Sequence, residues 1–463
     1  MFHLLHKTIM TSTKSYRELH EEFVHTNTGG TPWECLLLVI PYPLLAFICC
    51  YCVNFVFKLQ SGFILFFTEF SLLVVPLILS LTLCHSYIHI FVSALLLSVI
   101  LCLICNLWNQ KKNFIRIAFT LVTSVKSRPY ITYFRSIVNL ISVFCILAVD
   151  FRVFPRHFAK TESYGFSLMD TGVGFYIIAN GIVSKSDTRE DVMKTIKSTL
   201  PIMGLGIFRC VSVKSLDYQQ VISEYGTHWN FFFTLAAVKL MATYLMNKFQ
   251  NKEMLTSIVL AILHQIILQA GVESWMISDA PRNNPLSANR EGICSLLGYL
   301  SLFLGAMAIG KSLQRDSVDL YQDLKHASKG FLISVFLFLA TFWLHSRYPV
   351  SRRFVNVTYI FWMISMTFLL LSVCILIEMC LRIIYFIKSK TTNDHLAPSV
   401  LNSINYNGLI FFLMGNIFTG VVNIWIQTLH VENRNSIVIL TVYMFILCFF
   451  ANIFYRNRIK FSL

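Results

Sequence analysis

The residues best suited to chemistry lie in one short polar segment between two apolar stretches. Asp150 closes an apolar stretch, and Lys160 follows ten residues later, across a turn that contains Pro155. A carboxylate that is partly removed from water has a raised pKa and can act as a general base near neutral pH. A nearby ammonium group can stabilise the oxyanion that develops during acyl transfer. Asp150 and Lys160 are therefore the candidate catalytic residues, although charges at the end of a span often only anchor a loop at the interface.

Asp170 places a second carboxyl group inside the next apolar stretch, at membrane depth. Ionisable side chains within a membrane are rare and face the bundle interior or a water-filled cavity. Arg209 and Lys239, cations inside later apolar stretches, are the expected partners of Asp170. A substrate-binding charge and a structural ion pair both fit this pattern. The glycines that follow, Gly172 and Gly174, are expected to permit close helix packing rather than to bind a ligand.

Further polar residues could line the same pocket as Asp150. Glu224, His228 and Asn230 open a later apolar stretch on the side expected for Asp150, although Trp and His at such a point also mark the membrane interface. The most polar loop, 273–295, has amide and charged groups that suit a polyol or phosphate headgroup, but that are also typical of a solvated loop. The candidate substrate-binding residues are Arg156, Asp170, Glu224, His228, Asn230, Arg290, Asn416 and Asn423, of which the last two share one helix face.

His264 is the most deeply placed histidine. Some membrane acyltransferases use an intramembrane histidine as a base. A lone histidine beside glutamines is more typical of a hydrogen-bonding core residue, and that is the role expected here.

The composition predicts that these residues are positioned by membrane-spanning helices. The chain has 463 residues, of which 56% are hydrophobic and 13% charged, whereas a soluble domain has about 25% charged residues. Repeated apolar runs of roughly 20 residues match the thickness of a bilayer. We expect an all-α polytopic transmembrane helical bundle, with a polar lead (1–32), a single multi-span domain (33–455) and a basic tail (456–463). The expected spans number about thirteen: 33–57, 63–83, 87–108, 136–149, 165–184, 199–213, 229–246, 254–275, 296–310, 330–345, 355–381, 408–427 and 437–455.

The net charge of +15 reflects basic loops between spans, which orient a membrane protein, rather than binding to nucleic acid. An odd number of spans with a cytosolic tail places the 150–160 loop on the side away from the cytosol. The strongest cytosolic signal is the loop that contains Lys111, Lys112, Arg116, Lys126 and Arg128. One basic segment contradicts this orientation, because it falls on the far side: Arg347, Arg352 and Arg353.

The 13 cysteines lie mostly inside apolar stretches, so they are expected to behave as small buried hydrophobic residues. They form no metal-binding spacing with histidine and no disulfide framework in the loops. We therefore expect no metal site and no bound cofactor. Internal repeats and paired broken spans, which are typical of secondary transporters, are also absent from the sequence.

Several of these segments together resemble one known family. They are Asp150-Phe-x-x-Phe-Pro-Arg-x-Phe-Ala-Lys-Thr-Glu162, Ser167-Leu-Met-Asp-x-Gly-Val-Gly174, Asn180-Gly181, Glu224-Tyr-Gly-x-His-Trp-Asn-Phe-Phe-Phe-Thr234, Asn289-Arg-Glu-Gly292, Gly298-Tyr-Leu300, Ser351-Arg-Arg353 and Asn416 to Asn423. The chain resembles the inositol acyltransferases of glycosylphosphatidylinositol (GPI) anchor synthesis, the phosphatidylinositol-glycan class W family of the endoplasmic reticulum membrane. The resemblance covers nearly the whole chain in order, apart from the extreme N-terminus.

The resemblance implies a membrane O-acyltransferase that moves a fatty acyl group, typically palmitoyl, from acyl-CoA to the inositol 2-hydroxyl of glucosaminyl-phosphatidylinositol. It implies Asp150 as the base on that hydroxyl and Lys160 as its partner, with acyl-CoA as a co-substrate and the lipid bilayer as the surroundings. Position 157 carries histidine where a second arginine is expected, which leaves its role open. The sequence contains no Ser or Cys nucleophile motif, so direct attack by the acceptor hydroxyl is the simpler mechanism.

Two other classes of function remain as alternatives. A multi-span lipid transporter or flippase would use Asp170, Arg209 and Lys239 to line a path, and a non-catalytic scaffold would need none of them. The sequence specifies no oligomeric state.

Overall fold

The computed structural model describes residues 27–59, 61–108, 128–184, 192–215, 222–313, 320–388 and 396–461, together with residues 16, 19 and 23. The regular secondary structure in these ranges is helical, and its one strand-like contact is an antiparallel bridge between Gly30 and Phe166. This confirms the predicted all-α membrane fold. The basic loop that contains Lys111, Lys112, Arg116 and Lys126 lies outside the described residues.

The helices are α3 (Pro32–Val39), α4 (Pro41–Tyr51), α5 (Phe63–Leu81), α6 (Ile88–Trp108), α8 (Pro129–Ala148), α9 (Leu168–Gly181), α10 (Val192–Ser215), α11 (Ile222–Tyr225), α12 (Phe231–Lys248), α13 (Glu253–Ile267), α14 (Glu273–Ile277), α15 (Pro285–Ala288), α16 (Arg290–Cys294), α17 (Leu296–Ser312), α18 (Leu320–His345), α19 (Val357–Ile387), α20 (Ser399–Tyr406), α21 (Gly408–Trp425) and α22 (Asn433–Arg456). Short helical turns are η1 (Cys52–Val56), η2 (His85–Tyr87), η3 (Arg156–Phe158), η4 (Leu268–Val272) and η5 (Thr428–His430).

Ten helical stretches of the described chain are long and apolar enough to cross a membrane. The other three expected spans, 165–184, 199–213 and 229–246, correspond to α9, α10 and α12. Helix α9 has only 14 residues, so it rises about 21 Å and falls short of a hydrocarbon core of roughly 30 Å. Helices α10 and α12 contain several lysines and an arginine. The predicted number of thirteen spans is therefore not confirmed.

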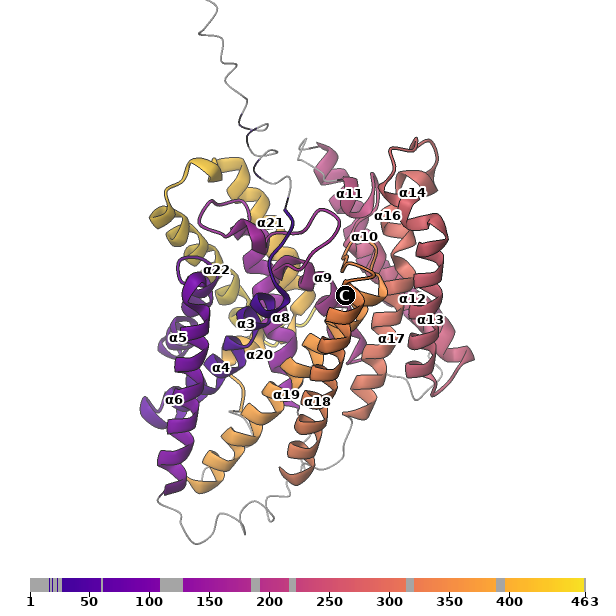
Figure 1. The fold of residues 1–463 in the computed structure, drawn as a ribbon. Coiled ribbons are helices and arrows are strands. Elements are labelled where there is room, and N and C mark those ends of the chain that lie inside the picture. The colour runs from indigo at the N-terminus through magenta and orange to yellow at the C-terminus, as the bar shows by residue number, and fades with distance from the viewer. Residues whose placement is uncertain are drawn as a thin grey trace, which may run out of the picture.

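The helices pack as a bundle in which α18 and α19 lie between two groups (Figure 1). Helices α4, α5, α6, α8 and α20 to α22 form one group, and α10, α12, α13 and α17 form the other. Helix α9 packs between α8 and α17. Its Gly174 lies close against α19, since an added Cβ would lie 2.8 Å from the side chain of Met363, whereas Gly172 has only an ordinary contact at 3.7 Å.

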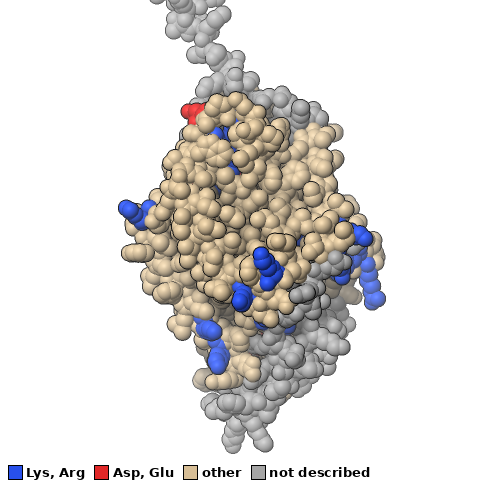
Figure 2. Space-filling view, turned by 90° about the vertical axis from the view of Figure 1, so that its right-hand side faces the viewer, with Lys and Arg blue, Asp and Glu red and all other residues tan. Residues whose placement is uncertain are grey.

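The outer helices show a polarity opposite to that of a soluble protein. Helix α13 buries Ser257, His264 and Gln265 and exposes a row of large apolar side chains. The upper part of the surface seen from this side shows few charged residues, and most of its lysines and arginines lie from mid-height downward (Figure 2). Such an apolar surface suits lipid, while small and polar side chains connect the helices inside.

Several connecting segments contact one another at two ends of the bundle. At one end, the 150–166 segment contacts the N-terminal residues, α11 and the 346–356 loop. At the other end, Tyr130 contacts Glu378 and Leu313, and Lys311 contacts Asn251. Which end faces the cytosol remains a prediction.

Candidate functional site

The segment 150–166, which we call the central segment, leaves α8 and is fixed to the bundle by three phenylalanines. Phe151, Phe154 and Phe158 are 0%, 0% and 2% exposed, so the apolar side chains at intervals of three and four residues all face inward. Burying one phenylalanine contributes about 1.5–3 kcal/mol, which is enough for three of them to hold a segment that has no long helix. The charged side chains between the phenylalanines are thereby held at defined positions.

The N-terminal lead crosses directly over this segment. The amide Nδ2 of Asn27 donates to the carbonyl of Ala159 at 2.6 Å, and the Glu162 N–H donates to the Asn27 carbonyl at 3.2 Å. Gly165 has φ +131°, and an added Cβ would lie 2.3 Å from the carbonyl oxygen of Thr28. Only glycine therefore allows the two backbones to approach this closely.

Asp150 lies at the end of α8, where α21 covers it. Its side chain is buried, and Asn423 Nδ2 of α21 donates to its Oδ2 at 2.7 Å. Arg156 turns back to donate to the carbonyl of Val149 at 2.8 Å. Burial lowers the pKa of Arg156, and the opposite charge of Asp150 counteracts that effect. Asp150 is thus a buried, oriented carboxylate near a guanidinium, an arrangement that can accept a proton from an acceptor hydroxyl.

Lys160, at the far end of the segment, is held by a different element. Its Nζ lies 2.7 Å and 2.9 Å from the two carboxylate oxygens of Glu224 on α11. Burial alone would raise the pKa of Glu224, but the charges of Lys160 and Arg352, the hydrogen bonds from Lys160 and the charge of Arg209 lower it to about 2. Glu224 therefore stays ionised and fixes the ammonium group of Lys160, whose side chain is 38% exposed. Glu224 and Lys160 are therefore in direct contact, and whether they share a pocket with Asp150 remains a prediction.

The carboxyl group of Asp170 joins three segments of the chain. Its Oδ2 accepts from the backbone N–H and the hydroxyl of Thr161 at 3.2 Å and 2.7 Å, and its Oδ1 accepts from Arg352 Nε at 2.8 Å. The prediction that Arg209 or Lys239 pairs with Asp170 was wrong. The 346–356 loop, which precedes α19, lies over the N-terminus of α9 and brings Arg352 there, whereas α10 and α12 pack mainly on each other.

The structure also explains two of the three basic residues that contradicted the expected orientation, Arg352 and Arg353. Although burial would lower the pKa of Arg352, the charges of Asp170 and Glu224 raise it. Arg352 and Arg353 are buried partners of carboxylates, at 4% and 9% exposed, rather than free charges of a loop. Lys239 donates to the hydroxyl of Ser198 at 3.0 Å. The path of Asp170, Arg209 and Lys239 on which the transporter alternative depended is therefore not formed.

Three other candidate residues make mainly structural contacts. Asn230 caps α12, accepting from the N–H of Phe232 at 3.0 Å, and its Nδ2 donates to the carbonyl of Gly206 at 2.9 Å. The backbone N–H of His228 donates to Asn289 Oδ1 at 2.8 Å, while its side chain is exposed. Asn416 Nδ2 donates at 2.8 Å to a carbonyl of its own helix, one turn back.

His264 and Arg290 both contact backbone carbonyl groups. His264 Nε2 lies 2.8 Å from the carbonyl oxygen of Phe354, which confirms a hydrogen-bonding core role. Arg290 is 3% exposed and donates to the carbonyl groups of Ser278 and Ala280. Its guanidinium group therefore holds the loop after α14 against α16.

Sequence reasoning missed one partner of the central segment and one partner of Asp170. Glu34 Oε1 lies 2.9 Å from Nε2 of His157, so a single acid at the start of the first span supports the segment. In the sequence, Arg352 stood out only as one of the basic residues expected on the side of the membrane where basic residues are disfavoured. That exception to the charge rule was a sign that the arginine is buried. The described residues contain no group of three or more His, Cys, Asp or Glu side chains placed to hold a metal ion.

The similarity of this chain to known proteins extends over nearly all of its helices. The GWT1 family model matches residues 16–454, from the N-terminal lead to the last helix. The chain belongs to the GWT1 family. As a GWT1-family protein it is an acyltransferase of the lipid-embedded, multi-span type, and the central segment lies well inside the matched region.

Three relatives illustrate the range of this family. The chain is 35% identical over 359 residues to the GPI-anchored wall transfer protein 1 of Yarrowia lipolytica, covering 73% of this chain and 74% of the relative. It is 32% identical over 508 aligned positions to the phosphatidylinositol-glycan biosynthesis class W protein of Dictyostelium discoideum, covering 96% and 99%. It is 30% identical over 443 residues to the human glucosaminyl-phosphatidylinositol-acyltransferase PIGW, covering 84% and 87%.

Proposed function

We propose that this GWT1-family protein transfers a fatty acyl group, with palmitoyl as the expected chain, from acyl-CoA to the inositol 2-hydroxyl of glucosaminyl-phosphatidylinositol. The reaction is the inositol acylation of GPI-anchor biosynthesis, and the protein acts in the endoplasmic reticulum membrane. The observation that carries the proposal is one rigid segment that holds a buried carboxylate, Asp150, and an ammonium group, Lys160, ten residues apart. The names of the relatives that act on glucosaminyl-phosphatidylinositol support the choice of acceptor.

The proposed reaction needs no enzyme-bound acyl group. The carboxylate of Asp150 takes the proton from the inositol hydroxyl, and the oxygen attacks the thioester carbonyl carbon. The carbon–oxygen bond forms, the carbon–sulfur bond breaks, and CoA leaves as its thiol after its thiolate takes the proton that Asp150 accepted. Lys160, held by Glu224, donates to the carbonyl oxygen while negative charge develops on it. Asn423 orients Asp150 through the bond to its Oδ2.

The test uses purified protein in lipid nanodiscs with labelled palmitoyl-CoA and glucosaminyl-phosphatidylinositol, and follows the lipid product by mass. Asp150→Asn keeps the size of the side chain and removes the base, so we expect transfer to fall by at least about 100-fold. Lys160→Ala is expected to lower transfer to a similar extent. Arg152→Gln is the matched control, because Arg152 is an exposed charge of the same segment.

Wild-type protein that is folded but forms no acylated lipid would contradict the proposed reaction. Transfer at the wild-type rate by Asp150→Asn would instead leave the reaction standing and remove Asp150 from the role of base.

A further inference from the structure

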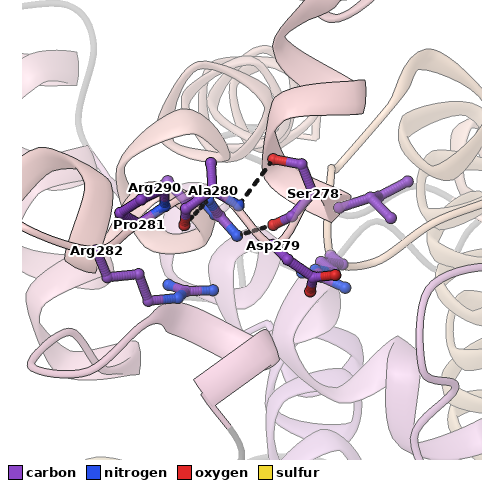
Figure 3. A pocket seen from close by; sticks show the side chains of 8 residues that line it. Ser278, Asp279, Ala280, Pro281, Arg282 and Arg290 are labelled. Atoms are coloured by element: carbon purple, nitrogen blue, oxygen red, sulfur yellow. Dashed lines mark hydrogen bonds between the residues drawn. The ribbon is translucent and has the colours of Figure 1, made fainter.

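A cavity lies beside the central segment, at the same end of the bundle. Its volume is about 380 Å³, within the range of roughly 300–1,000 Å³ typical of ligand sites. Its wall includes three arginines, Arg282, Arg290 and Arg353, together with the loop 278–281 (Figure 3). We call this cavity the arginine pocket. Arg290 reaches across to the carbonyl groups of Ser278 and Ala280, so that loop is fixed rather than free.

The arginine pocket is connected to the segment that holds Lys160. Arg353 NH1 donates to the hydroxyl of Ser163 at 3.3 Å, and the hydroxyl of Ser351 donates to the carbonyl of Ser163. Helix α11, which supplies Glu224, packs against α16, which supplies Arg290. A molecule whose reacting end lies at Lys160 could therefore place another part in the arginine pocket.

The positive charge of the pocket exceeds its buried negative charge. Glu291 is 0% exposed and is shared by all three arginines: Arg282 at 2.6 Å and 3.0 Å, Arg353 at 3.2 Å, and Arg290 Nε at 3.6 Å. One carboxylate cannot neutralise three guanidinium groups. Asp279 adds a second negative charge at the rim, where it is exposed to solvent, so a positive excess remains.

Two of these arginines are buried, and their Nε–H groups lack a hydrogen-bond acceptor among the described residues. Arg290 is 3% exposed and Arg353 is 9% exposed, and the Nε of Arg290 lies 3.6 Å from Glu291 Oε1, beyond hydrogen-bond reach. Burial lowers the pKa of Arg353; Glu291 counteracts this effect, whereas the charges of Arg282 and Arg290 add to it. Guanidinium groups bind phosphate oxygens through paired, charge-assisted hydrogen bonds.

We propose that the arginine pocket binds a phosphate group of one of the two substrates during acyl transfer. The inference rests on the proposed function, because both substrates carry phosphate: the nucleotide part of acyl-CoA and the phosphodiester of the inositol lipid. The site is distinct from Asp150 and Lys160, and its role is to position a substrate, not to react.

The decisive variant is Arg282→Gln, because Arg282 is partly exposed and its loss leaves Glu291 with two other arginines. KM is measured for palmitoyl-CoA and for glucosaminyl-phosphatidylinositol separately. We expect one KM to rise about 10- to 100-fold, the loss typical of one charge-assisted contact, while the other KM stays within about twofold. A rise for palmitoyl-CoA identifies the CoA phosphates as the ligand, and a rise for the lipid identifies its phosphodiester.

Arg347→Gln is the matched control, since Arg347 is an exposed arginine at the same end and outside the pocket. Arg282→Lys keeps the charge but loses the planar fork, so it should give an intermediate KM. If Arg282→Gln cannot be purified as a folded protein, the KM values of Arg282→Lys test the proposal in its place. Values of KM within twofold of wild type for both substrates, or equal changes in the control, would overturn the proposal and leave the cluster a structural clamp.

A binding measurement separates this inference from the proposed reaction. Thermal stability of wild type, Arg282→Gln and Arg347→Gln is followed while CoA or glycerophosphoinositol is titrated, without any turnover. Stabilisation of wild type and the control, but not of Arg282→Gln, supports the pocket even if no acyl transfer occurs. Equal stabilisation of all three proteins, or none, contradicts the pocket even if acyl transfer is normal.

Discussion

The link between Glu224 and Lys160 offers the sharpest test of how the site is held together. Lowering the pKa of Glu224 from its ordinary value of 4.5 to about 2 corresponds to roughly 3 kcal/mol in favour of the ionised carboxylate. The side chain of Lys160 is 38% exposed, so water screens the pair, and we expect the interaction to contribute about 1–2 kcal/mol. Glu224→Gln should therefore lower both the stability of the protein and its acyl transfer, the latter by about tenfold, because Lys160 is no longer fixed.

A double-mutant cycle isolates this interaction. Thermal unfolding and initial rates are measured for Glu224→Gln, Lys160→Gln and the double variant, with Glu162→Gln as the matched control for an exposed carboxylate two residues from Lys160. We expect the double variant to be little worse than Lys160→Gln alone, which gives a coupling energy of about 1–2 kcal/mol. Additive effects, with a coupling below about 0.3 kcal/mol, would refute the reasoning.

The same pair predicts a pH dependence of defined sign. Because the folded-state pKa of Glu224 is depressed, its contribution to stability is fully present above its ordinary value of 4.5 and is lost as the pH falls toward about 2. The charges that face Glu224 are those of Lys160, Arg352 and Arg209. Wild type should lose more stability than Glu224→Gln when unfolding is followed from pH 6 down to pH 3. Parallel curves would show that Glu224 is not strongly stabilised as a carboxylate.

Three further substitutions separate structural from catalytic roles. Asp170→Asn removes the carboxylate that pairs directly with the buried Arg352, so thermal unfolding should show a loss of about 3–5 kcal/mol, and an unchanged midpoint would contradict the anchoring role. Asn423→Ala removes the donor that orients Asp150, so the rate of transfer should fall about tenfold with little change in unfolding, and a purely thermal defect would argue against orientation. Gly165→Ala places a side chain at φ +131° against a backbone carbonyl, so we expect at least about 1–3 kcal/mol of destabilisation by thermal unfolding; a wild-type midpoint would mean that the N-terminal lead does not cross there.

The sequence by itself determined the membrane class, the order of the helices and the segment that holds Asp150 and Lys160. These features depend on local patterns: apolar runs of bilayer length, and a polar segment whose inward side is marked by phenylalanines at close intervals. Length and hydropathy alone do not give the number of spans, because α9 is shorter than a typical spanning helix and α10 contains charged residues.

Only the tertiary structure decided which charges meet. Asp170 pairs with Arg352, 182 positions away, and Lys160 pairs with Glu224, 64 positions away. No local pattern encodes such a pairing, because it depends on which helix ends lie together after packing. The same packing buries Arg352 and Arg353 beside carboxylates, which explains why these two basic residues depart from the charge rule for loops. A charge removed from water needs an opposite charge beside it.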